Sequence, residues 1–398
     1  MFSRIKGFLG RHKKKFIFTG ILIGGTTLAI RYAKWKLREW QERETKEFLE
    51  RTQRQQHFES TERTCNQTIV SLAPSVHEVV VQIFNTDDIV TQLRTSGANK
   101  IILWDQLKVI SFTRAAVFVY AGTMLVLTLR IQLNLIGGYM YQDSAEENST
   151  KVTRITSSLQ ECFLSSCHFF IEHGMKELCK LMEDKVKPIM EGVSLKKKLT
   201  LQDTEQLFWA IQASVTADSR DPIKSLPRYM MPAIQDNTAY NLSPSETEML
   251  QKMVAETIDL LESDEVTSLA ASSVSRAFTA FIDQISDFFT PAQGNKAALN
   301  APQMPSSDLG QVAGSSKSTD SVALIENQSK NGYSNGTTTF VHPNNVTMPL
   351  AKLLPVVCSI FQNNGKGDGI TPWINQHILN DKIKLLGANV YEAFCQKV

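Results

Sequence analysis

The stretch KIILWDQLKVISFTRAAVFVYAGTMLVLTLRIQLNLIGGYMY, residues 100–141, decides the fold. It contains no proline, and its central run from Ala115 to Leu129 carries no charged residue. A run of this length is typical of a helix buried in a protein core, because roughly 20 apolar residues are needed to cross a bilayer. We therefore expect one long helix from about Lys100 to Tyr141 at the centre of a helical domain. A second membrane span is the alternative.

The rest of the chain also predicts helices, because no segment alternates between polar and apolar residues as a half-buried strand does. Residues 35–62 are rich in Glu, Arg, Lys and Gln and predict a long solvated helix. It continues into residues 64–84, where Pro74 predicts a break or kink. Thr86-Asp87-Asp88 is expected to supply the N-cap of the next helix, and Ser243 with Glu246 forms the capping box of another. Further helices are expected at 154–190, 200–216, 244–262, 265–289, 349–361 and 371–395.

An apolar run near the N-terminus predicts a membrane anchor. The run FIFTGILIGGTTLAI, from Phe16 to Ile30, has no charge, and basic residues flank it on both sides. As a helix it is about 22 Å long, and flanking basic side chains can extend it to the bilayer surfaces. A cleaved signal peptide fits less well, because no small-residue cleavage site follows the run. The preceding basic cluster consists of Arg11, His12, Lys13, Lys14 and Lys15.

Composition bounds the environment of the chain. Its 398 residues carry a net charge of +2, which gives no reason to expect a nucleic-acid partner. Six irregularly spaced cysteines predict reduced thiols, so we expect the bulk of the chain to face the cytosol. Residues 291–347 are rich in Gly, Ser, Asn, Pro and Thr and predict a disordered insert. The expected order is a basic segment (1–15), an anchor (16–33), a bundle (34–290), the insert, and C-terminal helices that complete the bundle (348–398).

No motif for catalysis is visible. His77 and Glu78 are followed by Val81 where a zinc protease needs its second histidine. The glycines of residues 365–369 lack the spacing of a phosphate-binding loop. Cysteines and histidines between Cys162 and Cys179 fall on different helical faces, which disfavours a metal site. We expect no catalytic residue, metal, cofactor or small-molecule substrate.

The most informative side chain is Trp104. Counting about 100° per residue places four residues within about 60° of it: Lys100, Leu107, Lys108 and Ser111. Ile102 and Val109 fall on the far side, so the pattern predicts an aliphatic stripe facing the core and Trp104 facing water between two lysines. An exposed tryptophan is a typical binding anchor, although a covering helix would bury it equally well.

Several collinear segments resemble the peroxin-three family, the membrane-anchored docking factors of peroxisome biogenesis. They cover nearly the whole chain outside residues 291–347, and no short signature defines the family. The segments are RHKKKFIF (11–18), QRQQHFES (53–60), RTCN (63–66), ILWDQLKVISFTR (102–114), LRIQLNLIGGYMY (129–141), VSLKKKLTL (193–201) and ANVYEAF (388–394).

The resemblance implies an all-α fold: an N-terminal transmembrane anchor, then an elongated bundle in the cytosol. It also implies a groove for the N-terminal amphipathic helix of the cargo receptor peroxin-nineteen, which delivers membrane proteins to the peroxisome. Trp104 would lie at its centre, and Lys100 and Lys108 would favour acidic residues of the receptor. Leu93 and Met140 join the lining on the resemblance alone, beside Leu107. The targeting signal would lie in Arg11–Lys15 with the anchor, which contacts peroxisomal membrane lipid.

Two rival hypotheses remain. An organelle tether or inheritance-factor anchor would use a surface away from Trp104. A membrane-bound enzyme would need a buried cluster of titratable groups in a cleft, which the sequence does not show. The sequence leaves open whether the chain first passes through the endoplasmic reticulum.

Overall fold

The computed structural model describes residues 2–95, 100–145, 155–232, 242–289, 345–361 and 370–396, and the side chains from residue 24 onward except at 145. These residues form two compact units, 1–60 and 61–398. Nearly all of the predicted insert, residues 291–344, lies outside the described part, so its disorder stays a prediction. The described residues are almost entirely helical, which confirms the all-α class.

Helix α1 (Phe2–Ile83) contains the anchor segment and both predicted helices that follow it. The predicted break at Pro74 is absent, because the helix continues through that residue. Ala73 and Val76 are fully buried on either side of the proline, so tertiary packing offsets the lost backbone hydrogen bond. Residues 16–33 are helical here, but whether they span a membrane stays a prediction.

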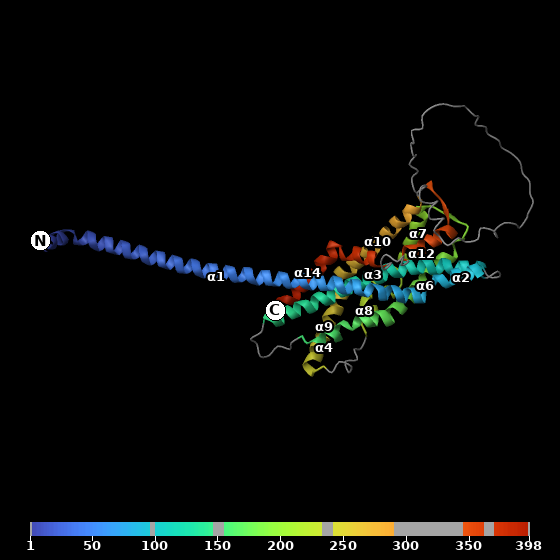
Figure 1. The fold of residues 1–398 in the computed structure, drawn as a ribbon, viewed down its shortest axis with the longest axis horizontal. Helices are drawn as coiled ribbons and strands as arrows, with labels where there is room; N and C mark the ends of the chain where they lie inside the picture. The colour runs from blue at the N-terminus through green and yellow to red at the C-terminus, as the bar shows by residue number, and fades with distance from the viewer. Residues whose placement is uncertain are drawn as a thin grey trace, which may run out of the picture. The chain divides into compact units, whose positions relative to one another are not determined.

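Helix α3 (Lys100–Ala145) runs through the second unit and contacts most of its other helices, including α6 (Met175–Glu191) and α14 (Asp381–Cys395) (Figure 1). In the described part it is the helix long and apolar enough to cross a membrane, and 89% of its most apolar window is buried inside the protein. The prediction of a core helix is therefore confirmed. Gly138 permits the close approach of α14, since a Cβ there would lie 2.8 Å from the Cβ of Phe394.

The segment predicted as one helix at 154–190 is divided. It forms α4 (Ser157–Leu164), α5 (Ser166–Phe169), the π-helix η1 (Phe170–Gly174) and α6. Serine side chains compete with the helix at the first break: Ser165 donates to the carbonyl of Cys162 at 2.6 Å, and Gln132 donates to Ser166 at 2.8 Å. A short helix, α8 (Leu226–Met230), was not predicted.

Local capping signals were predicted with mixed success. The capping box of Ser243 and Glu246 at the start of α9 (Pro244–Glu262) is confirmed. Helix α2 (Thr86–Thr95) is capped instead by Asn85, whose side chain accepts from the backbone of Asp87 and Asp88. Thr86 is unavailable because its hydroxyl accepts from Arg114 at 2.9 Å.

The remaining elements complete the second unit. Asn380 caps α14 and divides the helix predicted at 371–395. The strands β1 and β2 are two residues each and pair antiparallel, and the sequence did not predict them. The bounds are β1 (Lys198–Leu199), α7 (Leu201–Thr216), α10 (Asp264–Ser286), η3 (Asp287–Phe289), β2 (Met348–Pro349), α12 (Leu350–Ile360) and α13 (Thr371–Ile378).

Candidate partner-binding surface

Apolar side chains are exposed at the start of α3. Ile101 is 76% exposed and Ile102 is 58% exposed, and the half-buried Trp104 packs against the core two residues further on. Lys100 beside them is half-buried, and Leu93 of α2 and Leu107 are buried in the core. Ile101 lies about 60° from Trp104 around the helix, and we call these two residues the Trp104 surface; Ile102 is about 160° from Trp104 and lies outside it. Two adjacent isoleucines in water are unfavourable, and such exposure marks candidate contact sites.

The predicted orientation of this helix is wrong. Leu103, Leu107 and Ser111 face inward, whereas Ile102 lies on the exposed side together with Asp105 and Gln106. Trp104 therefore lies at the edge of the core and not in the middle of a wet face. The prediction failed because it treated Lys108 and Ser111 as solvated, and both are buried with polar partners.

Lys108 belongs to the interior. Its side chain is 3% exposed, and Nζ donates to the carbonyl of Val193 at 2.9 Å and lies 3.0 Å from Oδ1 of Asp105. A buried ammonium with these partners does not flank an exposed tryptophan. The expected contact between Lys108 and acidic residues of a partner is therefore corrected to an internal contact.

Two further connections hold the surroundings of the Trp104 surface in place. The loop of Val193 is joined to the start of α12, because Leu350 N donates to Lys197 O at 3.0 Å. Ser111 lies 3.0 Å from the sulfur of Cys358 on α12. The start of α3 is thus bordered by the loop of Val193, and by α2 and α12, two helices that lie at the same end of the second unit in Figure 1.

Met140 does not lie with the other predicted groove residues. It is 36% exposed, but it follows Trp104 by 36 residues of one continuous helix. At about 1.5 Å per residue this is about 54 Å. The start of α3 and the end of α2 hold the other predicted groove residues, Leu93, Lys100, Trp104 and Leu107, so Met140 cannot contribute to the same groove.

The sequence analysis missed the exposed Ile101 and Ile102. Their positions gave a signal, because two adjacent isoleucines about 100° apart on a helix rarely both face the core.

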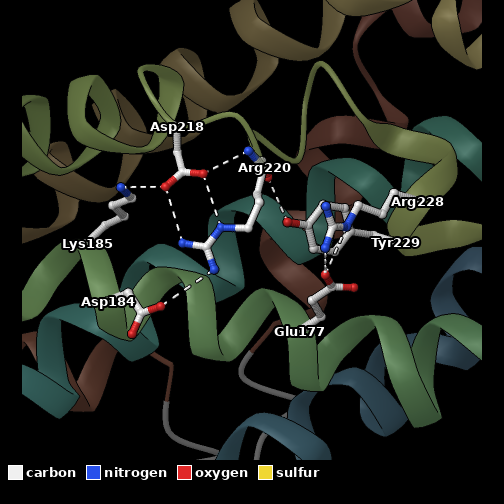
Figure 2. Close-up of polar contacts among 7 residues, drawn as sticks. All are labelled: Glu177, Asp184, Lys185, Asp218, Arg220, Arg228 and Tyr229. Atoms are coloured by element: carbon white, nitrogen blue, oxygen red, sulfur yellow. Dashed lines mark hydrogen bonds and ion pairs between the residues drawn. The ribbon is translucent and has the colours of Figure 1, made fainter.

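A cluster of charged groups joins α6 to the loop that follows α7. Figure 2 shows the carboxylate of Asp218 between the side chains of Lys185 and Arg220. The carboxylate lies 2.5 Å from Nζ of Lys185 and 3.1 Å from Nε of Arg220, and Arg220 also lies 3.6 Å from Asp184. The hydrogen bonds from Arg220 and then Lys185 hold the pKa of Asp218 well below its usual range. All these charges are paired, which is the arrangement of a structural contact between segments.

The remaining reactive groups are buried thiols. All six cysteines are free and buried. Burial raises the pKa of Cys65 and Cys167 to about 11 and that of Cys179 to about 12, which keeps these thiols protonated and unreactive. In the described part of the chain, no three His, Cys, Asp or Glu side chains are grouped to hold a metal ion.

The fold and surface define a class: a helical chain with an exposed apolar surface at the start of α3 and, in the second unit, a structural cluster of paired charges. The sequence model of the family described as Peroxin-3 matches residues 7–102, 94–154 and 141–392. The chain is 35% identical to "Peroxisomal biogenesis factor 3" of Bos taurus over 413 residues, which cover 99% of this chain and 98% of the relative. It is 34% identical to the protein of that name in Rattus norvegicus, with the same coverage, and 24% identical to "Peroxisome biogenesis protein 3-1" of Arabidopsis thaliana, over 75% of this chain and 88% of the relative. The chain therefore belongs to the Peroxin-3 family.

Proposed function

We propose that this chain is a non-catalytic docking receptor of peroxisome biogenesis. Its Trp104 surface binds the N-terminal amphipathic helix of a peroxin-nineteen-type cargo receptor, and this contact enables insertion of peroxisomal membrane proteins. Membership in the Peroxin-3 family supports the role in peroxisome biogenesis. The exposure of Ile101 beside the half-buried Trp104 is the observation that supports this place for the contact.

The chemistry of the surface suits an amphipathic helix. Such a partner inserts apolar side chains spaced three and four residues apart, and a half-buried tryptophan offers them a large rigid contact. Ile101 would cover the apolar face of the helix from the side, and Lys100 lies close enough to favour an acidic residue next to it. Lys108 and Met140 have no part in this contact.

The proposed placement in the cell follows from the N-terminus. Residues 16–33 anchor the chain once in the peroxisomal membrane, and the second unit lies in the cytosol, where the receptor is met. The basic cluster Arg11–Lys15 and the run Phe16–Ile30 provide the targeting signal. Free, buried cysteines in the second unit suit a reducing compartment.

A titration tests the proposal. Residues 41–398 are titrated with a fluorescent peptide of the receptor's N-terminal helix, with Trp104→Ala beside wild type. Loss of a central aromatic contact should weaken binding by at least about 2 kcal/mol, or about 30-fold. Trp209→Ala is the matched control, because Trp209 is 65% exposed on α7 and lies outside the Trp104 surface.

Each outcome distinguishes between hypotheses. Weakening by Trp104→Ala alone supports both the partner and the site. Equal weakening by Trp209→Ala would mean that the contact extends over α7 and is misplaced here. A folded wild-type fragment that does not bind the peptide would favour the organelle tether.

A further inference from the structure

The segment that directly follows the apolar run of α1 carries exposed cations. Arg31, Lys34 and Arg38 are all exposed, and no acidic residue stands between Ile30 and Arg38 in the sequence. This segment belongs to the first compact unit and is a regular part of α1. Its charges therefore have fixed positions on a helix.

The cations of this segment differ in whether they are neutralised. Lys36 and Arg43 both pair with Glu39, at 3.2 Å and 2.5 Å, and these hydrogen bonds lower the pKa of Glu39, with Arg43 contributing most. Arg31, Lys34 and Arg38 have no ion-pair partner among the side chains that the structure describes. Three unneutralised cations are thus separated from two neutralised ones within thirteen residues of one helix.

The three unpaired cations share one face. Lys34 and Arg38 lie within about 60° of Arg31 around the helix, whereas Lys36 and Arg43 lie about 120–140° away. The rise from Arg31 to Arg38 is about 10 Å. Helical side chains lean toward the N-terminus of their helix, and here that direction leads back to the apolar run. The long side chains of Lys34 and Arg38 can therefore reach the headgroup layer, which is about 5–8 Å thick on each side of a bilayer.

Aromatic side chains at the same level support an interfacial position. The rings of Tyr32 and Trp35 lie 6.0 Å apart, and both are more than half exposed. Exposed tyrosine and tryptophan next to an apolar span are typical of the membrane–water interface. Water alone would not favour two exposed rings beside three unpaired cations, but a layer of lipid headgroups favours both.

We propose that Arg31, Lys34 and Arg38 form a binding site for anionic phospholipid headgroups in the leaflet on the C-terminal side of the apolar run. The inference rests on the membrane anchor of the proposed function and adds the class of lipid that the anchor selects. The site holds phosphate and carboxylate oxygens of the headgroup against the cationic face, while the Glu39 face points away from it. The preference weakens at high ionic strength, because the charges are exposed.

Lipid analysis of the full-length chain tests the site. The protein is reconstituted in phosphatidylcholine bilayers that contain about one tenth phosphatidylserine, excised in polymer-bounded discs, and analysed for lipid composition. Two double variants are compared, Lys34→Gln with Arg38→Gln and Lys36→Gln with Arg43→Gln. Each removes two positive charges from the same segment, but only the first removes them from the proposed face. Resistance to alkaline carbonate extraction reports separately whether each protein is inserted.

Wild-type discs should be enriched in phosphatidylserine. Each cation near an anionic surface changes the preference for phosphatidylserine over phosphatidylcholine about fivefold, so the first variant, which removes two of the three cations, should lower that preference by more than tenfold. The second variant should keep the enrichment. An inserted wild-type chain without enrichment, or equal loss in both variants, would overturn the site. A chain that is extracted by carbonate would instead refute the anchor.

Discussion

Replacing Lys108 by methionine tests whether this lysine holds the wall beside Trp104 or faces a partner. Methionine keeps most of the aliphatic stem and removes the ammonium, which donates to the carbonyl of Val193 at 2.9 Å and pairs with Asp105 at 3.0 Å. A hydrogen bond from a charged donor contributes about 1.5–3 kcal/mol. Removing a buried ammonium also relieves a desolvation cost, so we expect a net loss of about 1–2 kcal/mol of unfolding free energy.

Asp105 supplies the matched control for this prediction. Its side chain is about half exposed, so its ion pair with Lys108 is screened by water. Asp105→Asn should therefore change the unfolding free energy by less than about 0.5 kcal/mol. Urea unfolding of residues 41–398, followed by circular dichroism, measures both variants.

Two results would refute this reasoning. Lys108→Met could prove as stable as wild type, which would mean that the bond to Val193 contributes nothing. Alternatively, a stable Lys108→Met variant could lose more than about tenfold in affinity for the receptor peptide. That result would return Lys108 to the contact surface.

Three further predictions concern the second unit. Burial, and to a lesser degree Arg276, lowers the pKa of His377 from 6.5 to about 4, so acidification protonates this histidine in the unfolded chain first. Wild type should therefore lose about 2 kcal/mol of unfolding free energy between pH 7 and pH 5, whereas His377→Gln should not. Urea unfolding at both pH values checks this, and an equal loss in both proteins would contradict it. Gly174→Ala should destabilise the protein by about 2 kcal/mol or more in thermal unfolding, because the added Cβ would meet the carbonyl oxygen of Tyr229. Gly192→Ala should be neutral or slightly stabilising, because the atom nearest to its added Cβ is 3.7 Å away. The six buried cysteines should resist a thiol reagent until urea is added, and rapid labelling of any of them in the folded chain would count against the described core.

The central helix could be predicted because its apolarity does not depend on which face is buried. From Ser111 to Tyr139 every residue of α3 is buried, so any orientation of the helix gives the same result. The box at Ser243 could also be predicted, because its donor and acceptor lie three residues apart. An apolar run and a capping box can both be predicted because each depends only on residues that are close together in the sequence.

The start of α3 could not be oriented from the sequence for the opposite reason. The buried Lys108 donates to the carbonyl of Val193, 85 residues further along the chain, and the buried Ser111 contacts the sulfur of Cys358, 247 residues further along. Helical spacing treats such polar residues as solvated, and that assumption turned the predicted wet face toward the core. The division of the segment 154–190 likewise depends on Gln132, which lies 34 residues before Ser166.

Amide hydrogen exchange of residues 41–398, with and without the receptor peptide, tests the central claim most directly. The proposal predicts that the peptide slows exchange in α2 and in the first turns of α3, around Leu93 and Trp104. Exchange around Met140 should stay unchanged, since that residue lies about 54 Å along the helix from Trp104. Protection confined to Met140 or to α7, with the start of α3 unaffected, would contradict the account.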